Sequence, residues 1–256
     1  PNSVTKPKRV LSIDLGQVNL MTAVTNVPGL RPWIIDGGDV KYVNGCFNHE
    51  ISKAQSRLPN QRSVLLNRLW YRREQKMRTL FHLCARRVID YCRMFKIDKI
   101  VAGYNTNWKC RSRLGKVGNR HFQKVPYRLF LKNLFDKAEL EGIDMCENEE
   151  SYTSKCDALA LESFEDCINR NKKRRVKRGL YSSITDRLLN ADVNGAINIM
   201  RKHIVKAHSY LVDQFNTLIN TACTHFMSPI KLKVKNLIGS LFWDAFGSPD
   251  EQLRCR

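Results

Sequence analysis

The amino-acid sequence predicts an α/β fold, a mixed five-stranded sheet with helices on both faces. Short apolar runs rich in β-branched residues recur along the chain. Long segments with the three- and four-residue apolar spacing of helices separate the later runs. Hydrophobic residues make up 43% of the 256 residues, which is enough to build a core. No stretch approaches the roughly 18 apolar residues of a membrane-spanning helix, so we expect no membrane protein.

The first three strands follow one another closely. Residues 9–15 (RVLSIDL) form a buried apolar run that carries Asp14 near its end, and residues 20–26 form a second run. A third strand is expected near residues 33–43, after a Pro-Gly turn. Such short connections favour an antiparallel meander.

Helical segments separate the remaining strands. We expect a long helix over residues 50–96, a strand at 96–104, a helix at 126–141, a strand at 143–147 and a helix starting near Asp192. Strands joined by helical crossovers lie parallel, and the crossovers are right-handed. This order is the ribonuclease H topology, in which chemistry gathers at the carboxyl ends of the parallel strands.

One main domain is expected over residues 9–203. Within it, residues 156–188 form an irregular basic insertion. Residues 204–256 form a partly helical C-terminal extension of unknown role, whose apolar side chains could pack on the core or contact a partner.

The chain carries 44 Lys and Arg against 24 Asp and Glu, a net charge of +20. Such an excess favours a polyanionic partner, with nucleic acid ahead of an anionic membrane surface. Twelve basic residues face three acids over residues 50–96, and seven of the nine residues 170–178 are basic. We interpret the first region as an electrostatic footprint and the second as a phosphate clamp, although a localisation signal or a solvated loop would carry a similar run. The predicted nucleic-acid contacts are Arg72, Arg73, Lys155, Lys172, Lys173, Arg174, Arg175, Lys177 and Arg178.

The nine cysteines are odd in number and include no C-x-x-C pair, so reduced thiols are expected instead of a disulfide framework. The first residues lack the apolar stretch of a signal peptide. We expect a protein that is not secreted: cytoplasmic or nucleoid-associated in a prokaryote, nuclear in a eukaryotic or viral setting.

Acidic residues follow the strand ends that this topology brings together. Asp14 ends the first strand, Glu149 and Glu150 follow the last, and Asp192 opens the last helix. Converging carboxylates suit Mg²⁺, and two such ions can clamp the attacking and leaving oxygens of a phosphodiester. Asp14 alone could cap a turn and Asp192 alone could stabilise a helix end. Their combination favours catalysis.

Four strings, SIDLG (12–16), EESYTSK (149–155), KRGLY (177–181) and NADVNGAINI (190–199), resemble the RuvC-type nuclease domain of TnpB proteins. These are transposon-encoded, RNA-guided DNA endonucleases akin to Fanzor proteins and type V CRISPR effectors. The resemblance implies Mg²⁺-dependent DNA cleavage, with DNA and a guide RNA as partners.

The sequence departs from that family at one acid. Many members carry an acid where this chain has Gly103. Because the strand at 143–147 would lie about 4.8 Å from its neighbour, an acid after it could reach the same metals. We hypothesise that Glu150 replaces the missing acid, with Glu149 as the alternate. The predicted catalytic and metal-binding set is therefore Asp14, Glu150 and Asp192.

Two further departures concern neighbouring regions. Relatives often carry a zinc ribbon of two C-x-x-C pairs between YTSK and the last motif. Here only Cys156 and Cys167 lie between them, so zinc is not expected. Full-length relatives also have a region before the first strand that handles the guide. Eight residues precede it here, so either the chain is a fragment or that part is absent.

Other functional hypotheses stay open beside the nuclease. A domesticated nucleic-acid-binding protein of the same fold, without activity, is the alternative that Gly103 favours. An actin-like ATPase would need a second D-x-G phosphate loop and an adenosine-site glycine cluster, which we do not find. Asn194 and Asn198 lie four apart on the last helix, where structural hydrogen bonding is the expected role.

Overall fold

The computed structural model describes residues 8–16, 18–57, 63–104, 125–149, 151–169, 175–177, 179–221, 223–237 and 244–246. The strands are β1 (Val10–Leu15), β2 (Asn19–Thr25), β3 (Trp33–Asp36), β4 (Lys99–Gly103), β5 (Asp144–Asn148), β6 (Arg175–Lys177), β7 (Leu180–Ser182), β8 (Leu188–Asn190) and β9 (Ile230–Leu232). The α-helices are α1 (Gly38–Gln55), α2 (Val64–Met94), α4 (Tyr127–Leu140), α5 (Phe164–Asn169), α6 (Ala191–Ala207), α7 (Val212–Thr221) and α8 (Cys223–Met227), and two 3₁₀ turns are η1 (Ser209–Leu211) and η2 (Val234–Leu237).

The predicted mixed sheet is confirmed, with one more strand than expected. The strand order is β5-β4-β1-β2-β3-β9. β1, β2 and β3 form the antiparallel meander, whereas β4 and β5 lie parallel to β1. The sixth strand, β9, comes from the C-terminal extension and pairs in parallel with β3. The prediction of five strands was wrong: β9 alternates apolar and polar residues, but it is only three residues long and lies in a segment whose sequence was interpreted as partly helical.

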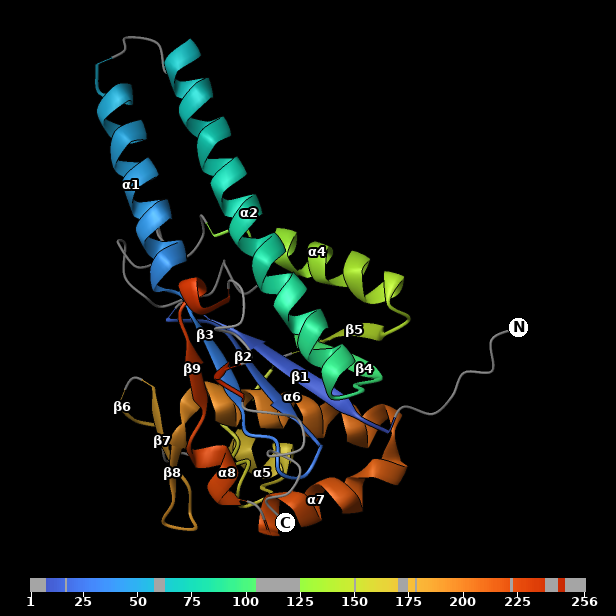
Figure 1. Ribbon diagram of the computed structural model, residues 1–256. Coiled ribbons are helices and arrows are strands. Elements are labelled where there is room, and N and C mark those ends of the chain that lie inside the picture. The colour runs from blue at the N-terminus through green and yellow to red at the C-terminus, as the bar shows by residue number, and fades with distance from the viewer. Residues whose placement is uncertain are drawn as a thin grey trace.

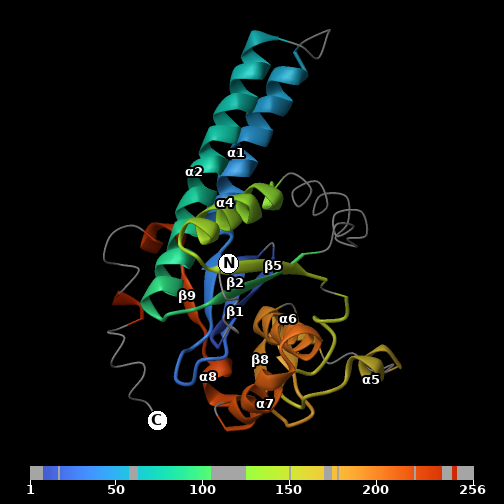
Figure 2. The same cartoon turned by 90° about the vertical axis from the view of Figure 1, so that its right-hand side faces the viewer.

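Helices form a layer on each face of the sheet (Figures 1 and 2). α2 and α4 cover one face, where they share a core with Leu11 and Ile13 of β1. α6 and α7 cover the other face, where the core includes Val10. Successive strand residues alternate between faces, so Asp14 lies on the α6 side with Val10 and Ser12. Among the described helices, none is both long enough and apolar enough to cross a membrane.

The segment predicted as one helix over 50–96 is a hairpin of two helices, and the predicted strand at 33–43 stops at Asp36. α1 begins at Gly38 and buries residues at helical spacing, Val40 and Asn44 among them. α2 begins after Ser63, whose hydroxyl oxygen accepts the Leu66 N–H at 3.1 Å as an N-cap. We call residues 38–57 and 63–82 the helical arm. The helical arm projects away from the sheet, as Figures 1 and 2 show.

The arm has a small apolar cluster of its own, separate from the two main cores. Its members are Phe47, Ile51, Ala54, Leu66 and Leu69. This cluster holds the two helices together beyond the sheet.

The described part of the C-terminal extension packs on the core. The Phe246 ring lies 5.7 Å from Trp33 and 5.3 Å from Tyr91, between ring centroids. The Val234 N–H donates to the Asp39 carboxylate at 3.1 Å, which ties the extension to the start of α1. These residues of the extension therefore pack on the core.

The basic insertion contains regular structure. Strands β6, β7 and β8 form a small antiparallel sheet. Asp157 is buried beside it, and its carboxylate accepts the Ser183 hydroxyl at 2.9 Å and the Ile184 N–H at 2.7 Å. These bonds anchor the small sheet next to the N-terminus of α6.

Candidate active site

Asp14 and Asp192 come together at one end of the sheet. α6 crosses β1 closely enough for the Ser12 hydroxyl to donate to the Ala196 carbonyl at 2.7 Å. A Cβ atom on Gly195 would collide with the Asp14 carboxylate. A Cβ atom on Gly16 would lie 3.9 Å from Oδ2 of Asp192. Asp14 thus lies against Gly195 of α6, and Asp192 lies near Gly16, which follows β1. Both carboxylates are half-buried.

The start of α6 determines where Asp192 lies. The Asn190 side chain is the N-cap, and its oxygen accepts the N–H groups of Asp192 and Val193 at 2.9 and 3.3 Å. Asp192 sits in the first turn, where the helix dipole favours negative charge. Since Asn190 already caps the helix, the Asp192 carboxylate is available for another role.

Two side chains flank the Asp192 carboxylate. The Asn19 amide at the start of β2 donates to Oδ2 at 2.7 Å. A guanidinium nitrogen of Arg175, on β6, lies 3.8 Å from Oδ1. Sequence reasoning placed Arg175 among the nucleic-acid contacts but missed Asn19. A polar residue at the head of the apolar strand LMTAVT was the available signal.

The loop after β1 is held from the other layer. The Tyr127 hydroxyl, at the start of α4, donates to the Gly16 carbonyl at 2.7 Å. Burial raises the pKa of Tyr127, so the hydroxyl remains a protonated donor. This bond fixes the backbone two residues beyond Asp14.

The predicted third acid falls outside the described residues. Gly103 ends β4 and lies opposite Asn148 of β5 in the parallel register. Asn148 turns toward α6, where its amide donates to the Ile199 carbonyl at 3.3 Å. Glu150 is two residues further along and is not described. Its catalytic role stays a prediction.

The structure does not bring Glu149 to the aspartate pair. Its exposed carboxylate accepts the Ser151 hydroxyl and lies 4.0 Å from the Lys202 ammonium. The Ser151 hydrogen bond, and then Lys202, lower the pKa of Glu149. Lys202 follows Asp192 by ten residues on α6, about 15 Å along the helix axis.

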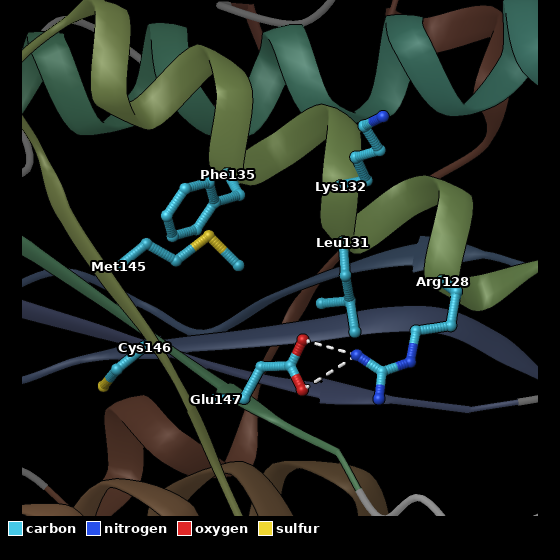
Figure 3. A pocket seen from close by; sticks show the side chains of 7 residues that line it. All are labelled: Arg128, Leu131, Lys132, Phe135, Met145, Cys146 and Glu147. Atoms are coloured by element: carbon cyan, nitrogen blue, oxygen red, sulfur yellow. Dashed lines mark hydrogen bonds and ion pairs between the residues drawn. The ribbon is translucent and has the colours of Figure 1, made fainter.

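Glu147 lies on the opposite face of the sheet from Asp14. Its two carboxylate oxygens accept from the Arg128 guanidinium of α4 at 3.0 and 3.2 Å, as Figure 3 shows. Both residues line a pocket of about 530 Å³ between α4 and β5, with Phe135 and Met145 on its apolar side. Glu147 therefore does not replace the acid missing at Gly103.

Two asparagines of α6 bind the end of the segment EESYTSK and the Cys156 that follows it. The Asn194 amide donates to the Cys156 carbonyl at 2.7 Å. Asn198 donates to the carbonyls of Thr153 and Cys156 at 2.9 and 2.8 Å. The expected structural role of Asn194 and Asn198 is confirmed. Lys155 remains exposed, with its ammonium 5.3 Å from the centre of the Tyr152 ring.

The predicted nucleic-acid contacts divide into three groups. Arg72, Lys155, Arg175 and Lys177 are exposed. Arg73 instead donates to the buried Asn44 side chain of α1 at 2.9 and 2.7 Å, which joins the two helices of the arm. The remaining members lie outside the described residues: Lys172, Lys173, Arg174 and Arg178.

Within the described residues, the insertion holds one cluster of potential metal ligands, Cys156, Glu162 and Cys167, with donor atoms within 4.8 Å of one another. The sequence analysis had identified the two cysteines but not Glu162. A structural zinc site uses four ligands, so three do not complete one. The half-buried Arg201 guanidinium beside Cys156 also disfavours a cation. That zinc is not bound stays a prediction, which stoichiometric zinc in purified protein would contradict.

The aspartate pair fits Mg²⁺. Carboxylate oxygens are the hard donors that Mg²⁺ prefers, and a site of one or two carboxylates plus substrate phosphate is common for this ion. Asn19 fixes one carboxylate by a hydrogen bond, as ligand-orienting partners do at metal sites. Asp14 and Asp192 could therefore supply two of the three predicted donors.

Comparison with known proteins supports the fold and the resemblance. The family OrfB_IS605, described as "Probable transposase", matches residues 1–109. The chain is similar to a solved structure titled "Cryo-EM structure of the Cas12f1-sgRNA-target DNA complex", at 18% identity and a TM-score of 0.56 over 77% of this chain. It is also similar to "Cryo-EM structure of CRISPR-Cas12f Ternary Complex", at 17% identity and a TM-score of 0.54 over 78% of this chain.

The chain spans 50% and 40% of the lengths of those two Cas12f chains. No curated protein matches it. The resemblance to TnpB-type proteins that the motifs indicate is confirmed, by the transposase family over residues 1–109 and by the Cas12f structures for the fold.

Proposed function

We propose that this chain is the nuclease domain of a TnpB-type, Mg²⁺-dependent DNA endonuclease that is guided by RNA in its full-length form and linked to a transposable element. One observation carries the proposal. Asp14 and Asp192, from SIDLG and NADVNGAINI, lie against Gly16 and Gly195 with no space for a larger residue at Gly195. The similarity to a transposase family and to Cas12f complexes with guide RNA and target DNA supports nucleic acids as partners.

In this proposal Asp14, Asp192 and Glu150 hold Mg²⁺. Mg²⁺ held there would supply charge stabilisation at the phosphodiester and would activate a water nucleophile. Asn19 keeps the Asp192 carboxylate in one orientation through its 2.7 Å bond. Arg175, exposed 3.8 Å from the same carboxylate, binds a DNA phosphate at the entrance to the site.

The alternative function is nucleic-acid binding without cleavage. The observation that favours it is the register pair Gly103 and Asn148, which places no carboxylate at the ends of β4 and β5. The two functions differ in what Glu150 does. If Glu150 is a metal ligand, its removal stops cleavage and leaves DNA binding in place.

The deciding experiment measures cleavage of supercoiled plasmid and single-stranded DNA with Mg²⁺, using protein purified with its bound RNA. We expect cleavage by the parent, and its loss to background in Asp14→Ala, Asp192→Ala and Glu150→Ala. Glu149→Ala is the matched control, because that neighbouring acid lies at Lys202, and it should retain the parent rate. A parent that fails to cut even with its guide RNA would establish the binding alternative.

A further inference from the structure

The outer side of α2 in the helical arm carries a row of exposed side chains. Arg68, Tyr71, Arg72 and Lys76 are spaced by three and four residues, so they lie on one side of the helix. The Tyr71 side chain is 64% exposed. A tyrosine ring thus lies among exposed cations on this side of α2.

The cations of this row are not neutralised by their described neighbours. Among the residues that the structure describes, no hydrogen bond or ion pair engages Arg68, Arg72 or Lys76. By contrast, Arg73 is bound to Asn44, and Arg78 pairs with Glu74 at 2.9 Å. The described residues of the arm hold eight Lys and Arg against three Asp and Glu. The row is therefore positively charged and able to contact a ligand.

The chemistry of the row fits a single strand of nucleic acid. Arginine and lysine bind phosphates of any sequence. An exposed tyrosine ring can stack on an unpaired base, whereas the faces of paired bases are covered within a duplex. A symmetric contact with a second copy of the chain would set the same cations against one another, which disfavours that occupant.

We propose that Tyr71, with Arg68, Arg72 and Lys76, forms a binding site for single-stranded nucleic acid on the helical arm. Tyr71 stacks on a base, and the three cations follow the phosphates on either side. This site rests on the proposed function in taking nucleic acid as the partner. It adds that the nucleic acid binds on the arm, that the bound strand is unpaired, and that a base stacks on Tyr71. The aspartate site requires none of these.

The test measures binding of a fluorescein-labelled 20-nucleotide mixed-sequence DNA or RNA strand by anisotropy. EDTA is present so that Mg²⁺-dependent cleavage cannot occur. Tyr71→Ala should weaken binding by about 5- to 150-fold, the range for loss of one base–aromatic stack. Its salt dependence should not change, and Tyr71→Phe should restore affinity. Arg72→Gln should reduce the slope of log K against log salt by about 0.7.

Tyr210→Ala is the matched control, because Tyr210 is a 46%-exposed tyrosine in η1, on the α6 side of the sheet. It should bind like the parent. Unchanged affinity in Tyr71→Ala would overturn the site. So would equal weakening for duplex and single strands, or a dimer that Tyr71→Ala converts to a monomer. A parent that binds through Tyr71 but does not cut overturns only the nuclease. Metal-dependent cutting with unaltered binding in Tyr71→Ala overturns only this site.

Discussion

Replacing Gly195 by alanine should separate catalysis from stability. The new Cβ would lie 3.3 Å from Cγ of Asp14 and in collision with its Oδ2, so the carboxylate must move by about 1 Å. A misplacement of about 1 Å at a reacting centre can cost about 100-fold in rate. We therefore expect Gly195→Ala to cleave DNA about 100-fold more slowly than the parent.

The same substitution should leave folding nearly intact. Alanine is favoured over glycine in a helix interior by about 1 kcal/mol. Overpacking costs about 1–3 kcal/mol, and the lower end applies because the half-buried Asp14 carboxylate can rotate. The free energy of unfolding should thus fall by no more than about 2 kcal/mol, as measured by urea denaturation.

Gly45→Ala is the matched control for the rate and for stability. Gly45 lies within α1, and a Cβ atom there meets nothing within 4 Å. It should raise the free energy of unfolding by about 1 kcal/mol and leave cleavage unchanged. A second measurement is the rise in melting temperature with Mg²⁺, which Gly195→Ala should diminish. A folded Gly195→Ala protein with the parent's cleavage rate and Mg²⁺ response would refute the reasoning.

Three other substitutions test the surroundings of the site. Asn19→Ala frees the Asp192 carboxylate and should lower the cleavage rate about 10- to 100-fold at fixed Mg²⁺, with partial recovery at higher Mg²⁺; no change in rate would contradict the orienting role. Asn198→Ala removes one donor from the Thr153 carbonyl and one of two from the Cys156 carbonyl. It should lower the free energy of unfolding by about 1–3 kcal/mol, or the melting temperature by roughly 2–12 °C in calorimetry. Burial, and then the charge of Lys99, lower the pKa of His203 to about 4. An unfolded chain takes up this proton below about pH 6.5, so stability should fall by about 1–3 kcal/mol as pH drops from 6.5 to 4, and His203→Gln should flatten that dependence in thermal unfolding.

The parts of the site that sequence predicted best are those where motif and packing coincide. Asp14 and Asp192 stand in strings whose glycines are required by close approach: Gly195 faces the Asp14 carboxylate, and a Cβ atom on Gly16 would collide with the Asn19 carbonyl. Their pairing could be expected from topology alone, because the carboxyl end of β1 and the start of α6 meet at one edge of the sheet. The role of Asn19 could not, since it depends on a partner 173 residues away.

The missed elements carried weak local signals. α1 buries Asn44 and Ala54 at positions where a helix usually shows larger apolar residues, so its periodicity was obscured. Pro59 and the capping residue Ser63 in the sequence pointed to a new helix start, but the apolar spacing on either side suggested one continuous helix. β9 shows the alternation Ile-Lys-Leu, but three residues are too few to predict a strand, and its place in the sheet depends on pairing with β3.

The two aspartates also set the order in which the site can form during synthesis. Asp14 leaves the ribosome 178 residues before Asp192, an interval of roughly 10–35 s at ordinary translation rates. Until α6 emerges, the strand bearing Asp14 lacks the helix that covers it and the partner acid. The aspartate pair, and with it any metal site that both carboxylates would hold, is therefore absent from a nascent chain or a truncated product that lacks α6.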